Sequence, residues 1–394
     1  MPTASDNIST WTNFIPFSPP NPNSPLGLKG RFQSEAAKEL STLMINGHGD
    51  DTYHYRNIRL NFSSNIPTFV DLSALEEHLR TRLSVIRSYP EPSAYALEAK
   101  IAHLIGKNPA QVMVTSGATE AIYLIAQAAS LLSTGASTYT VVHPTFSEYD
   151  SACQMFGLQN HPFDEEEREP HEEVGGETLC WLCNPNNPTG EFYDEAYVRD
   201  LVLRHQWLVI DQSYEDYSLR KLEGIDDLPN VICLHSMTKK YCIPGLRLGY
   251  ITASAEVIDV LRLFCRPWAV NALAIEAGMW LMDHRPQLID MPAYLDEAQR
   301  LRNALNNVPG IHVRETQTNF MLCSIEGCTA AELKDYLAKE YGILIRDASN
   351  FPGLTPHHFR VAAQRPEDNN ELVNILKQIR THALPLSVGE GGSM

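Results

Sequence analysis

The sequence lacks the features that would place the chain in a membrane or route it for secretion. None of its apolar runs reaches the roughly 20 residues that a bilayer-spanning helix needs. Residues 1–25 have neither the basic start nor the apolar stretch of a secretory signal. We therefore expect a cytoplasmic protein with no membrane partner.

Positive charge is also scarce. The 394 residues include 31 Lys and Arg against 48 Asp and Glu, and the formal net charge at pH 7 is -17. Nucleic acids and anionic membrane surfaces are bound mainly through clustered positive charge, so we expect neither as a partner. An anionic substrate would have to be held by a local cluster of Arg or Lys.

The chain holds eight cysteines but lacks the second Cys pair of a zinc ribbon. Several cysteines lie inside apolar runs, such as Cys180 and Cys183 in TLCWLC, Cys233 in VICLH and Cys323 in FMLCS. We expect buried free thiols in a reducing compartment. Cys180 and Cys183 could alternatively be half of a redox or zinc site, but their side chains would point to opposite faces of a strand.

Between residues 110 and 255 the sequence alternates short apolar runs with helical patterns. The runs are rich in Val, Ile and Leu and apolar on both faces, which is typical of parallel strands covered by helices on both sides. This alternation predicts an α/β fold with an open, mostly parallel sheet. The runs are VMVT (112–115), TYTVV (138–142), TLCWLC (178–183), WLVID (207–211), VICLH (231–235) and LGYIT (248–252).

The flanking segments differ in composition from this central region. The start of the chain is rich in Pro, Ser and Asn, which indicates a partly disordered arm. After about residue 270 helices and strands mix as in a second, α+β domain. We expect an arm (1–40), a segment that contributes to a small domain (41–75), a large domain (76–268) with an acidic loop (164–177), a small C-terminal domain (269–384) and a tail (385–394).

Polar or Gly- and Pro-rich clusters follow most of the apolar runs. Ligands of open α/β sheets bind beyond the carboxyl ends of the strands. The clusters therefore predict one shared active site. They are SGATE (116–120), HPTFSEY (143–149), NPNNPTG (184–190), DQSY (211–214) and HSMTKKY (235–241).

The segment SMTKKYCIPGLRLG (236–249) carries groups suited to a Schiff base and a phosphate monoester. A Schiff-base lysine needs a fixed position and cationic neighbours that keep its amine unprotonated. A phosphate monoester needs hydroxyls, backbone N–H groups and a bidentate arginine. Ser236, Thr238, Lys239 and Arg247 supply this set. The alternative is a surface pair of lysines beside a turn.

The cluster SGATE joins a predicted strand to a predicted helix. Small residues let the backbone approach an anion, and a helix N-terminus presents free N–H groups and partial positive charge. We interpret Gly117, Ala118 and Thr119 as a phosphate-binding turn. Many strand–turn–helix joints that bind nothing have similar sequences.

Asp211 ends the run WLVID, and Tyr214 follows three residues later. A carboxylate that faces a pyridine nitrogen keeps it protonated and makes the ring an electron sink. Tyr214 can donate to the O3′ of such a ring, Asn187 can present its amide to the same oxygen, and Phe146 can stack on the ring face. The alternatives are that Asp211 caps a turn and that Phe146 packs in the core.

Together these motifs resemble a known family. VTSGATEAI, HPTFSEY, NPNNPTG, DQSY and SMTKKYCIPGLRLGY resemble, in order, the signature blocks of fold-type-I pyridoxal-5′-phosphate (PLP) enzymes, the class I/II aminotransferase family, over roughly residues 45–380. The resemblance implies PLP as the cofactor and a seven-stranded type of sheet between helices, with a smaller α+β domain. In the family the catalytic lysine lies eight positions before the phosphate-binding arginine, and counting back from Arg247 selects Lys239 over Lys240.

The resemblance also implies roles for the other residues. Asp211 would face the pyridine nitrogen, and Tyr214 and Asn187 would face O3′. Arg360 would clamp the substrate α-carboxylate. Tyr89 would reach the cofactor phosphate of the neighbouring subunit, which implies a homodimer with shared active sites. The cofactor phosphate would be bound by Ser236, Thr238, Arg247, Ala118 and Thr119.

Within the family the chain looks most like threonine-phosphate decarboxylases of cobalamin biosynthesis, which are close relatives of histidinol-phosphate aminotransferases. This likeness is carried by NGHGDD and LNFSSNIP (46–67), RPWAVNALA (266–274), ILIRDASNFPGL (343–354) and FRVAA (359–363). A phosphorylated substrate needs further cationic or amide donors. The candidates are His48, which could also be an ordinary loop histidine, and Asn65, Arg346 and Asn350.

Two departures from the decarboxylase pattern concern acidic residues. Asp50 and Asp51 stand where the pattern has a glycine and a polar residue. Two carboxylates there would repel a substrate phosphate unless they point away. We do not interpret them, with their His neighbours, as a metal site. The usual Asp-Glu-Ala after the strand is Asp211-Gln212-Ser213, which keeps the key aspartate.

We therefore predict a PLP-dependent lyase that decarboxylates O-phospho-L-threonine to (R)-1-amino-2-propanol O-2-phosphate. The alternative is transamination of histidinol phosphate, or another amino acid, with 2-oxoglutarate. The two outcomes differ in which bond to Cα stands perpendicular to the cofactor ring, and sequence does not show that rotation. A non-catalytic protein of this fold is a third hypothesis, against which the full set of Lys239, Asp211, Arg247 and Arg360 argues.

Overall fold

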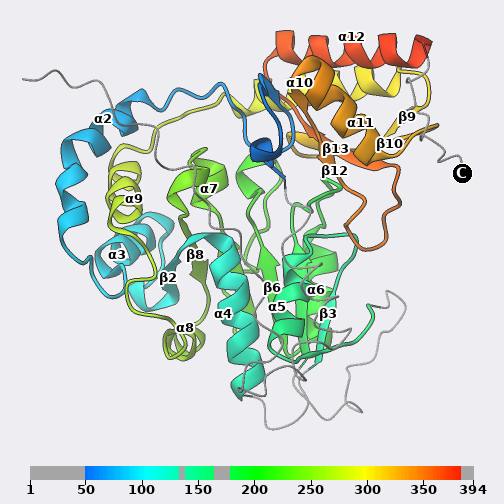
Figure 1. Cartoon of the computed structure of the whole chain (residues 1–394). Helices are drawn as coiled ribbons and strands as arrows, with labels where there is room; N and C mark the ends of the chain where they lie inside the picture. The colour runs from blue at the N-terminus through cyan, green and yellow to red at the C-terminus, as the bar shows by residue number, and fades with distance from the viewer. Residues whose placement is uncertain (1–48, 133–137, 164–177, 383–394) are drawn as a thin grey trace, which may run out of the picture. The chain divides into compact units, whose positions relative to one another are not determined.

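The predicted apolar runs form strands of one seven-stranded sheet (Figure 1). The computed structural model describes residues 49–132, 138–163 and 178–382, so the predicted acidic loop, the arm and the tail lie outside the described residues. The strand order is β2-β8-β7-β6-β5-β3-β4. The strands are β2 (Val112–Thr115), β3 (Thr138–Val141), β4 (Gln159–Asn160), β5 (Thr178–Cys183), β6 (Trp207–Asp211), β7 (Val231–His235) and β8 (Gly249–Thr252).

Most neighbouring strands of this sheet are parallel, which confirms the predicted α/β class. The exception is β8, which is antiparallel to both β7 and β2 and which we had expected to be parallel. A parallel neighbour needs a crossover that returns the chain to the opposite edge of the sheet. Residues 236–248 instead hold only the short α7 (Met237–Lys240) and the 3₁₀ turn η6 (Pro244–Leu246). Lys239 and Arg247 therefore stay together at the carboxyl end of β7.

Helices cover both faces of the sheet because its strands are apolar on both sides. On one face α4 (Gly117–Leu132), α5 (Glu148–Met155) and α8 (Ala255–Arg262) pack against side chains such as Trp181 and Val209. On the other face α6 (Glu195–Arg204) packs against Leu182 and Leu208. The remaining helices of this region are α2 (Ser73–Arg82), α3 (Tyr95–Ile105) and α9 (Ala272–His284), which pack near Val112 and Leu248.

The cysteines follow this two-faced packing. Cys180 lies in the core on the α6 side, whereas Cys183 lies in the core on the α4 side. All eight cysteines are free, and each is buried except the half-buried Cys265. The prediction of buried free thiols is confirmed, and the opposite orientations of Cys180 and Cys183 exclude a shared half-site.

A second, four-stranded antiparallel sheet follows in the order β12-β13-β10-β9. Its core is formed with three helices and includes Phe62 and Phe359. Figure 1 draws these helices in orange and red, above the first sheet. The elements are α10 (Met291–Asn306), β9 (Ile311–Val313), β10 (Phe320–Ile325), α11 (Ala330–Tyr336), β12 (Arg346–Asp347), β13 (His358–Ala362) and α12 (Pro366–His382).

Residues near the start of the described chain form a separate two-stranded sheet and are hydrogen-bonded to the second sheet. Strand β1 (Leu60–Asn61) pairs in parallel with β11 (Ile343–Leu344), and the Ala362 N–H donates to the Phe62 carbonyl at 2.9 Å. All described residues belong to one compact unit, and the domain boundaries remain a prediction. Short turns complete the chain: the 3₁₀ helices η2 (Thr52–His54), η3 (Leu83–Arg87), η4 (Pro109–Gln111) and η5 (Glu215–Tyr217), and a π-helical turn (Leu337–Tyr341).

Among the described helices, none has the length and apolar character that crossing a bilayer demands.

The loop NPNNPTG after β5 meets the segment before β10 at Gly190. The Gln317 N–H donates to the Gly190 carbonyl at 2.8 Å. Gly190 has φ +73°, and a Cβ there would lie 2.0 Å from Thr316 Oγ1. Only glycine satisfies both the left-handed backbone and the close approach at this position.

We expect Gly190→Ala to lower the free energy of unfolding by about 3 kcal/mol or more, because strain and a clash add. Gly106→Ala is the matched control, since Gly106 has the same φ of +73° but no atom within 4 Å of the added Cβ. That variant should lose only about 1 kcal/mol. Urea unfolding followed by circular dichroism measures both, and equal losses would contradict the close-approach argument.

Candidate active site

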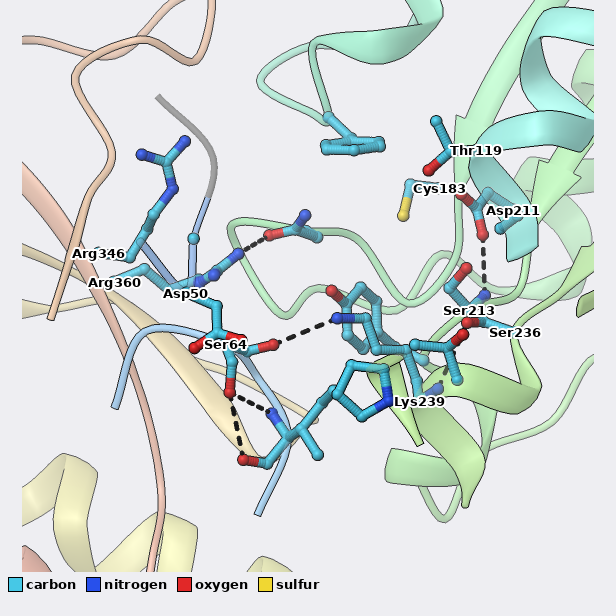
Figure 2. Close-up of a pocket in the computed structure, with 18 of the residues that line it drawn as sticks. Asp50, Ser64, Thr119, Cys183, Asp211, Ser213, Ser236, Lys239, Arg346 and Arg360 are labelled. Carbon is cyan, nitrogen blue, oxygen red and sulfur yellow. Dashed lines mark hydrogen bonds between the residues drawn. The ribbon is translucent and has the colours of Figure 1, made fainter. Parts of the chain in front are cut away.

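The carboxyl ends of the large-sheet strands open into a cavity of about 420 Å³ that the second sheet helps to line (Figure 2). Most of the side chains that the strand-end clusters predicted meet there, together with two arginines from β12 and β13. The predicted residues that line the cavity are Ala118, Thr119, Phe146, Asn187, Asp211, Tyr214, Ser236, Thr238, Lys239, Arg247, Arg346 and Arg360.

The other predicted site residues lie elsewhere. Gly117 lies behind the lining, next to Arg247, and Asn350 accepts a hydrogen bond from Arg346 at 2.8 Å. Asn65 is fully buried and is not a lining residue. It lies close to Tyr214, where it opposes part of the rise to about 12 that burial causes in that phenol's pKa. Tyr89 is 84% exposed and packs 5.1 Å from Trp268 in a separate surface cavity. His48 lies outside the described residues.

Lys239, rather than Lys240, lines the cavity. Ser236 caps α7 and accepts from the Lys239 N–H, and the Lys239 Nζ donates to the Ser64 carbonyl at 3.2 Å. Burial, followed by the positive charges of Arg360 and Arg247, lowers the pKa of Lys239 to about 8. Lys240 is exposed and pairs with Asp216 at 2.9 Å. Its side chain is only partly removed from water, and that desolvation, which lowers the pKa, is outweighed by Asp216, Tyr241 and Glu215, so the pKa of Lys240 is raised.

Asp211 is held from two sides, and only 4% of it is exposed. Its Oδ2 accepts from the Tyr149 hydroxyl at 2.7 Å and its Oδ1 accepts from the Ser213 N–H at 2.9 Å. Tyr149 is itself fixed by stacking on Trp181, with 5.1 Å between ring centroids. Burial and the charge of Asp211 raise the pKa of Tyr149 well above its usual value, so the phenol stays protonated and donates.

A phosphate-sized group of donors lies at the start of α4. Gly117 has φ +82°, and a Cβ there would lie 2.9 Å from Arg247 Nη2, so glycine lets the guanidinium approach the helix N-terminus. The hydroxyls of Ser236, Thr238 and Thr119 line the same cavity. This combination of hydroxyls, an arginine and a helix N-terminus suits a phosphate monoester.

Two buried arginines form the opposite end of the cavity. Arg346 and Arg360 face each other across the β12–β13 pair and are 5% and 4% exposed. Arg360 donates to Asn187 Oδ1 and, at 2.6 Å, to the Ser63 carbonyl. Burial lowers the pKa of both guanidiniums to about 10, and within the described chain the buried Arg360 Nε has no hydrogen-bond partner. Two buried like charges are unfavourable unless an anion joins them.

Comparison with known proteins identifies the family of this chain. Residues 57–376 match the model of the family "Aminotransferase class I and II". The chain belongs to the class I/II aminotransferase family. This family depends on PLP and includes both decarboxylases and aminotransferases among the relatives of this chain, so the chain is an enzyme of a PLP-dependent family.

Relatives of both kinds are similarly close. A putative threonine-phosphate decarboxylase of Caldanaerobacter subterraneus subsp. tengcongensis is 30% identical over 352 residues, which cover 84% of this chain and 93% of the relative. A histidinol-phosphate aminotransferase of the same organism is 28% identical over 304 residues, which cover 75% and 85%. The crystal structure of L-threonine-O-3-phosphate decarboxylase from Porphyromonas gingivalis is 34% identical, with a TM-score of 0.74 over 81% of this chain and 99% of that one.

Several lining residues of this class I/II aminotransferase site were not predicted from the sequence. They include Tyr149, Cys183, Asp50, Ser63 and Ser64. Tyr149 had a usable signal, because it lies in the same strand-end cluster as Phe146, three residues later on the start of α5. Ser63 and Ser64 lie in the block LNFSSNIP, which carried the decarboxylase likeness, but the contact of Ser64 with Lys239 joins positions 175 residues apart and follows from no local pattern.

We expect Lys239 to react with an amine-directed reagent at unusually low pH. Its pKa of about 8, against the ordinary 10.5, means that the free amine appears as the pH rises through 8. Pulse labelling of cofactor-free protein between pH 6 and 11, with mass spectrometry of the 236–247 peptide, measures the rate at each lysine. Lys240 is the internal control and should become reactive only above pH 10. Parallel profiles for the two lysines would contradict the assignment.

Proposed function

We propose that the chain binds PLP at Lys239 and decarboxylates O-phospho-L-threonine to (R)-1-amino-2-propanol O-2-phosphate, a step of cobalamin biosynthesis. The observation that carries the proposal is the pair of buried arginines in the same cavity as the low-pKa lysine. An amino acid with a second anionic group would satisfy both guanidiniums. The likeness to decarboxylases at 30% and 34% identity supports this choice.

The residues present fit the cofactor. The site holds an amine of lowered pKa, a fixed carboxylate and a separate group of phosphate donors. When bound, PLP supplies an electron-withdrawing ring that takes up the negative charge left when a bond to the substrate Cα breaks. Lys239 would hold the aldehyde carbon of PLP, and Asp211 would keep a proton at the pyridine nitrogen. Tyr214 and Asn187 would face O3′, and Phe146 the ring. Ser236, Thr238, Arg247 and the start of α4 would bind the phosphate.

Tyr149 would support Asp211 in this role. The two hydrogen bonds from the Tyr149 hydroxyl and the Ser213 N–H fix the direction of the Asp211 carboxylate. Its partners are a phenol of raised pKa and a backbone amide, neither of which gives up its proton to the carboxylate. Asp211 is thereby set to stabilise a positive charge beside it.

Arg360 and Arg346 would position the substrate. Arg360 would bind the α-carboxylate and Arg346, with Asn350 behind it, the second anion. Two fixed anchors determine the orientation of the bonds at Cα, which decides the bond that breaks. Burial of both guanidiniums strengthens their hold on anions and excludes water from the reacting carbon.

The alternative is transamination of histidinol phosphate with 2-oxoglutarate and glutamate. It is favoured by relatives at 28% identity that carry this name. The same lysine amine, with its lowered pKa, can move a proton at Cα. Glutamate also carries two carboxylates that would fit the two arginines.

A turnover assay separates the two functions. We expect CO₂ release from O-phospho-L-threonine without any 2-oxo acid, and turnover that requires 2-oxoglutarate would contradict the decarboxylase. Lys239→Ala should lower the rate at least about a thousandfold, because it removes the nucleophile. Lys240→Ala is the matched control and should stay within about twofold, since it breaks only an exposed ion pair.

We also propose a homodimer in which Tyr89 of each subunit completes the other subunit's site. Tyr89 lies away from the cavity on a surface that also exposes Ile86 and Trp268, and burial against a second copy would cover these apolar side chains.

Subunit mixing tests the shared site. Dimers that combine a Lys239→Ala subunit with a Tyr89→Ala subunit carry one intact site and one doubly altered site. After exchange of equal amounts, the mixture should recover about a quarter of the wild-type rate, because about half of the dimers are hybrids with one working site. A rate that never exceeds the mean of the two parents would show that Tyr89 acts within its own subunit or not at all.

A further inference from the structure

An acidic side chain lies at the arginine end of the cavity. Asp50 is a lining residue, and Figure 2 shows it beside Arg346 and Arg360, at the far side of the site from Asp211. Its N–H donates to Ser63 Oγ at 3.0 Å, and its Oδ1 accepts from Asn61 Nδ2 at 2.6 Å. Ser63 in turn accepts from Arg360 through its carbonyl. Asp50 is therefore fixed next to the group proposed to bind the substrate.

The neighbouring carboxylate points away from the site. Asp51 forms an ion pair with Lys334 of α11, with both side chains about seven-eighths buried, and it is not a lining residue. The sequence suggested that both carboxylates would repel a substrate phosphate unless they turned aside. The structure separates them: Asp51 pairs with Lys334 outside the lining, although its charge still reaches Arg346, whereas Asp50 lines the cavity.

Asp50 changes the charge balance of this end of the site. Arg346 and Arg360 supply two positive charges. Asp50 is the carboxylate among the described lining residues at this end, and Asp347 and Asp51 act on Arg346 from outside the lining. The negative charge of Asp50 also reaches Lys239, where it partly offsets the lowering of that amine's pKa by burial. A substrate group between the arginines and Asp50 is attracted by two charges and repelled by one. The repulsion grows in proportion to the charge that the group carries.

We propose that Asp50 makes the arginine end select a singly charged oxyanion, such as a sulfate ester or a protonated phosphate ester, over a phosphate dianion. The proposal deepens the proposed function and rests on its assignment of the arginine end to the second anion of the substrate. A protonated phosphate ester also has an O–H that can donate to the Asp50 carboxylate, which a dianion lacks. The specificity therefore lies in a carboxylate rather than in the arginines.

The test uses two ligands of matched shape and different charge. 3-Phosphooxybutanoate and 3-sulfooxybutanoate are threonine esters without the amine, so they cannot enter the reaction. At pH 8 the phosphate ester is mostly a dianion, because its second pKa is about 6, and the sulfate ester is a monoanion. Calorimetry with the PLP-loaded enzyme gives a dissociation constant for each ligand.

Asp50→Asn keeps the shape and the hydrogen bond at Oδ1 but removes the charge. We expect it to tighten binding of the phosphate ester about tenfold and of the sulfate ester only about threefold, because the repulsion scales with ligand charge. Asp51→Asn is the matched control, one residue away and already paired with Lys334. It should leave the ratio of the two dissociation constants within about twofold.

Three results would overturn the proposal: equal changes for both esters, weaker binding of the phosphate ester to Asp50→Asn, or no binding of either ester to either protein. Decarboxylation is measured separately on O-phospho-L-threonine. A shift in the ratio without CO₂ release would remove the proposed reaction and leave the role of Asp50 intact. CO₂ release without a shift in the ratio would support the proposed reaction and remove the role proposed for Asp50.

Discussion

The active site depends on the burial of several cationic groups in one cavity. Lys239, Arg346 and Arg360 share its lining, and burial lowers the pKa of each. The loss of hydration is unfavourable, and the like charges add to it. Anions that enter the cavity would relieve this repulsion, which is the basis for the proposed substrate with two anionic groups. The lysine gains most from the arrangement, because an amine of pKa about 8 is partly free at neutral pH.

The large sheet brings these groups together through its connections rather than through its strands. The segment between β7 and β8 never leaves the carboxyl edge, so Lys239 and Arg247 come from one turn. Gly117 and Gly249 allow this turn to lie against the start of α4, since a Cβ at either would meet Arg247 or backbone atoms at 3.0 Å or less. The second sheet then supplies the arginines. The site therefore lies between the two sheets. The residues proposed to bind PLP come from the large-sheet side, and Arg346 and Arg360 come from the other.

Much of this arrangement could be predicted from local sequence. Runs such as VMVT and WLVID are apolar on both faces, which predicts buried strands. The polar clusters after them mark the carboxyl ends of the strands, where ligands bind. The antiparallel direction of β8 was missed, because an apolar run does not show its direction; only the short connection before it does. The arginine end of the cavity was harder to predict from sequence. Ser63 and Ser64 reach the cavity because β1 pairs with β11, and no local pattern encodes a pairing across more than 280 residues. Asn65, in the same segment, is fully buried and does not line the cavity.

The choice of reaction is governed by the residues that sequence describes least well. In the roles proposed for them, Lys239, Asp211 and the phosphate donors would serve any reaction that begins with a bond breaking at Cα, so their presence does not separate a decarboxylase from an aminotransferase. The separation comes from where the substrate's anionic groups are held. Asp50, Arg346 and Arg360 form a site with two positive charges and one negative charge, fixed by Asn61, Ser63 and Asn350. In the role proposed for Asp50, repulsion of a second charge on the distal group would make the orientation of the substrate depend on charge as well as on shape. A change of one carboxylate beside an arginine pair would then change substrate selection without altering any group proposed to touch the cofactor.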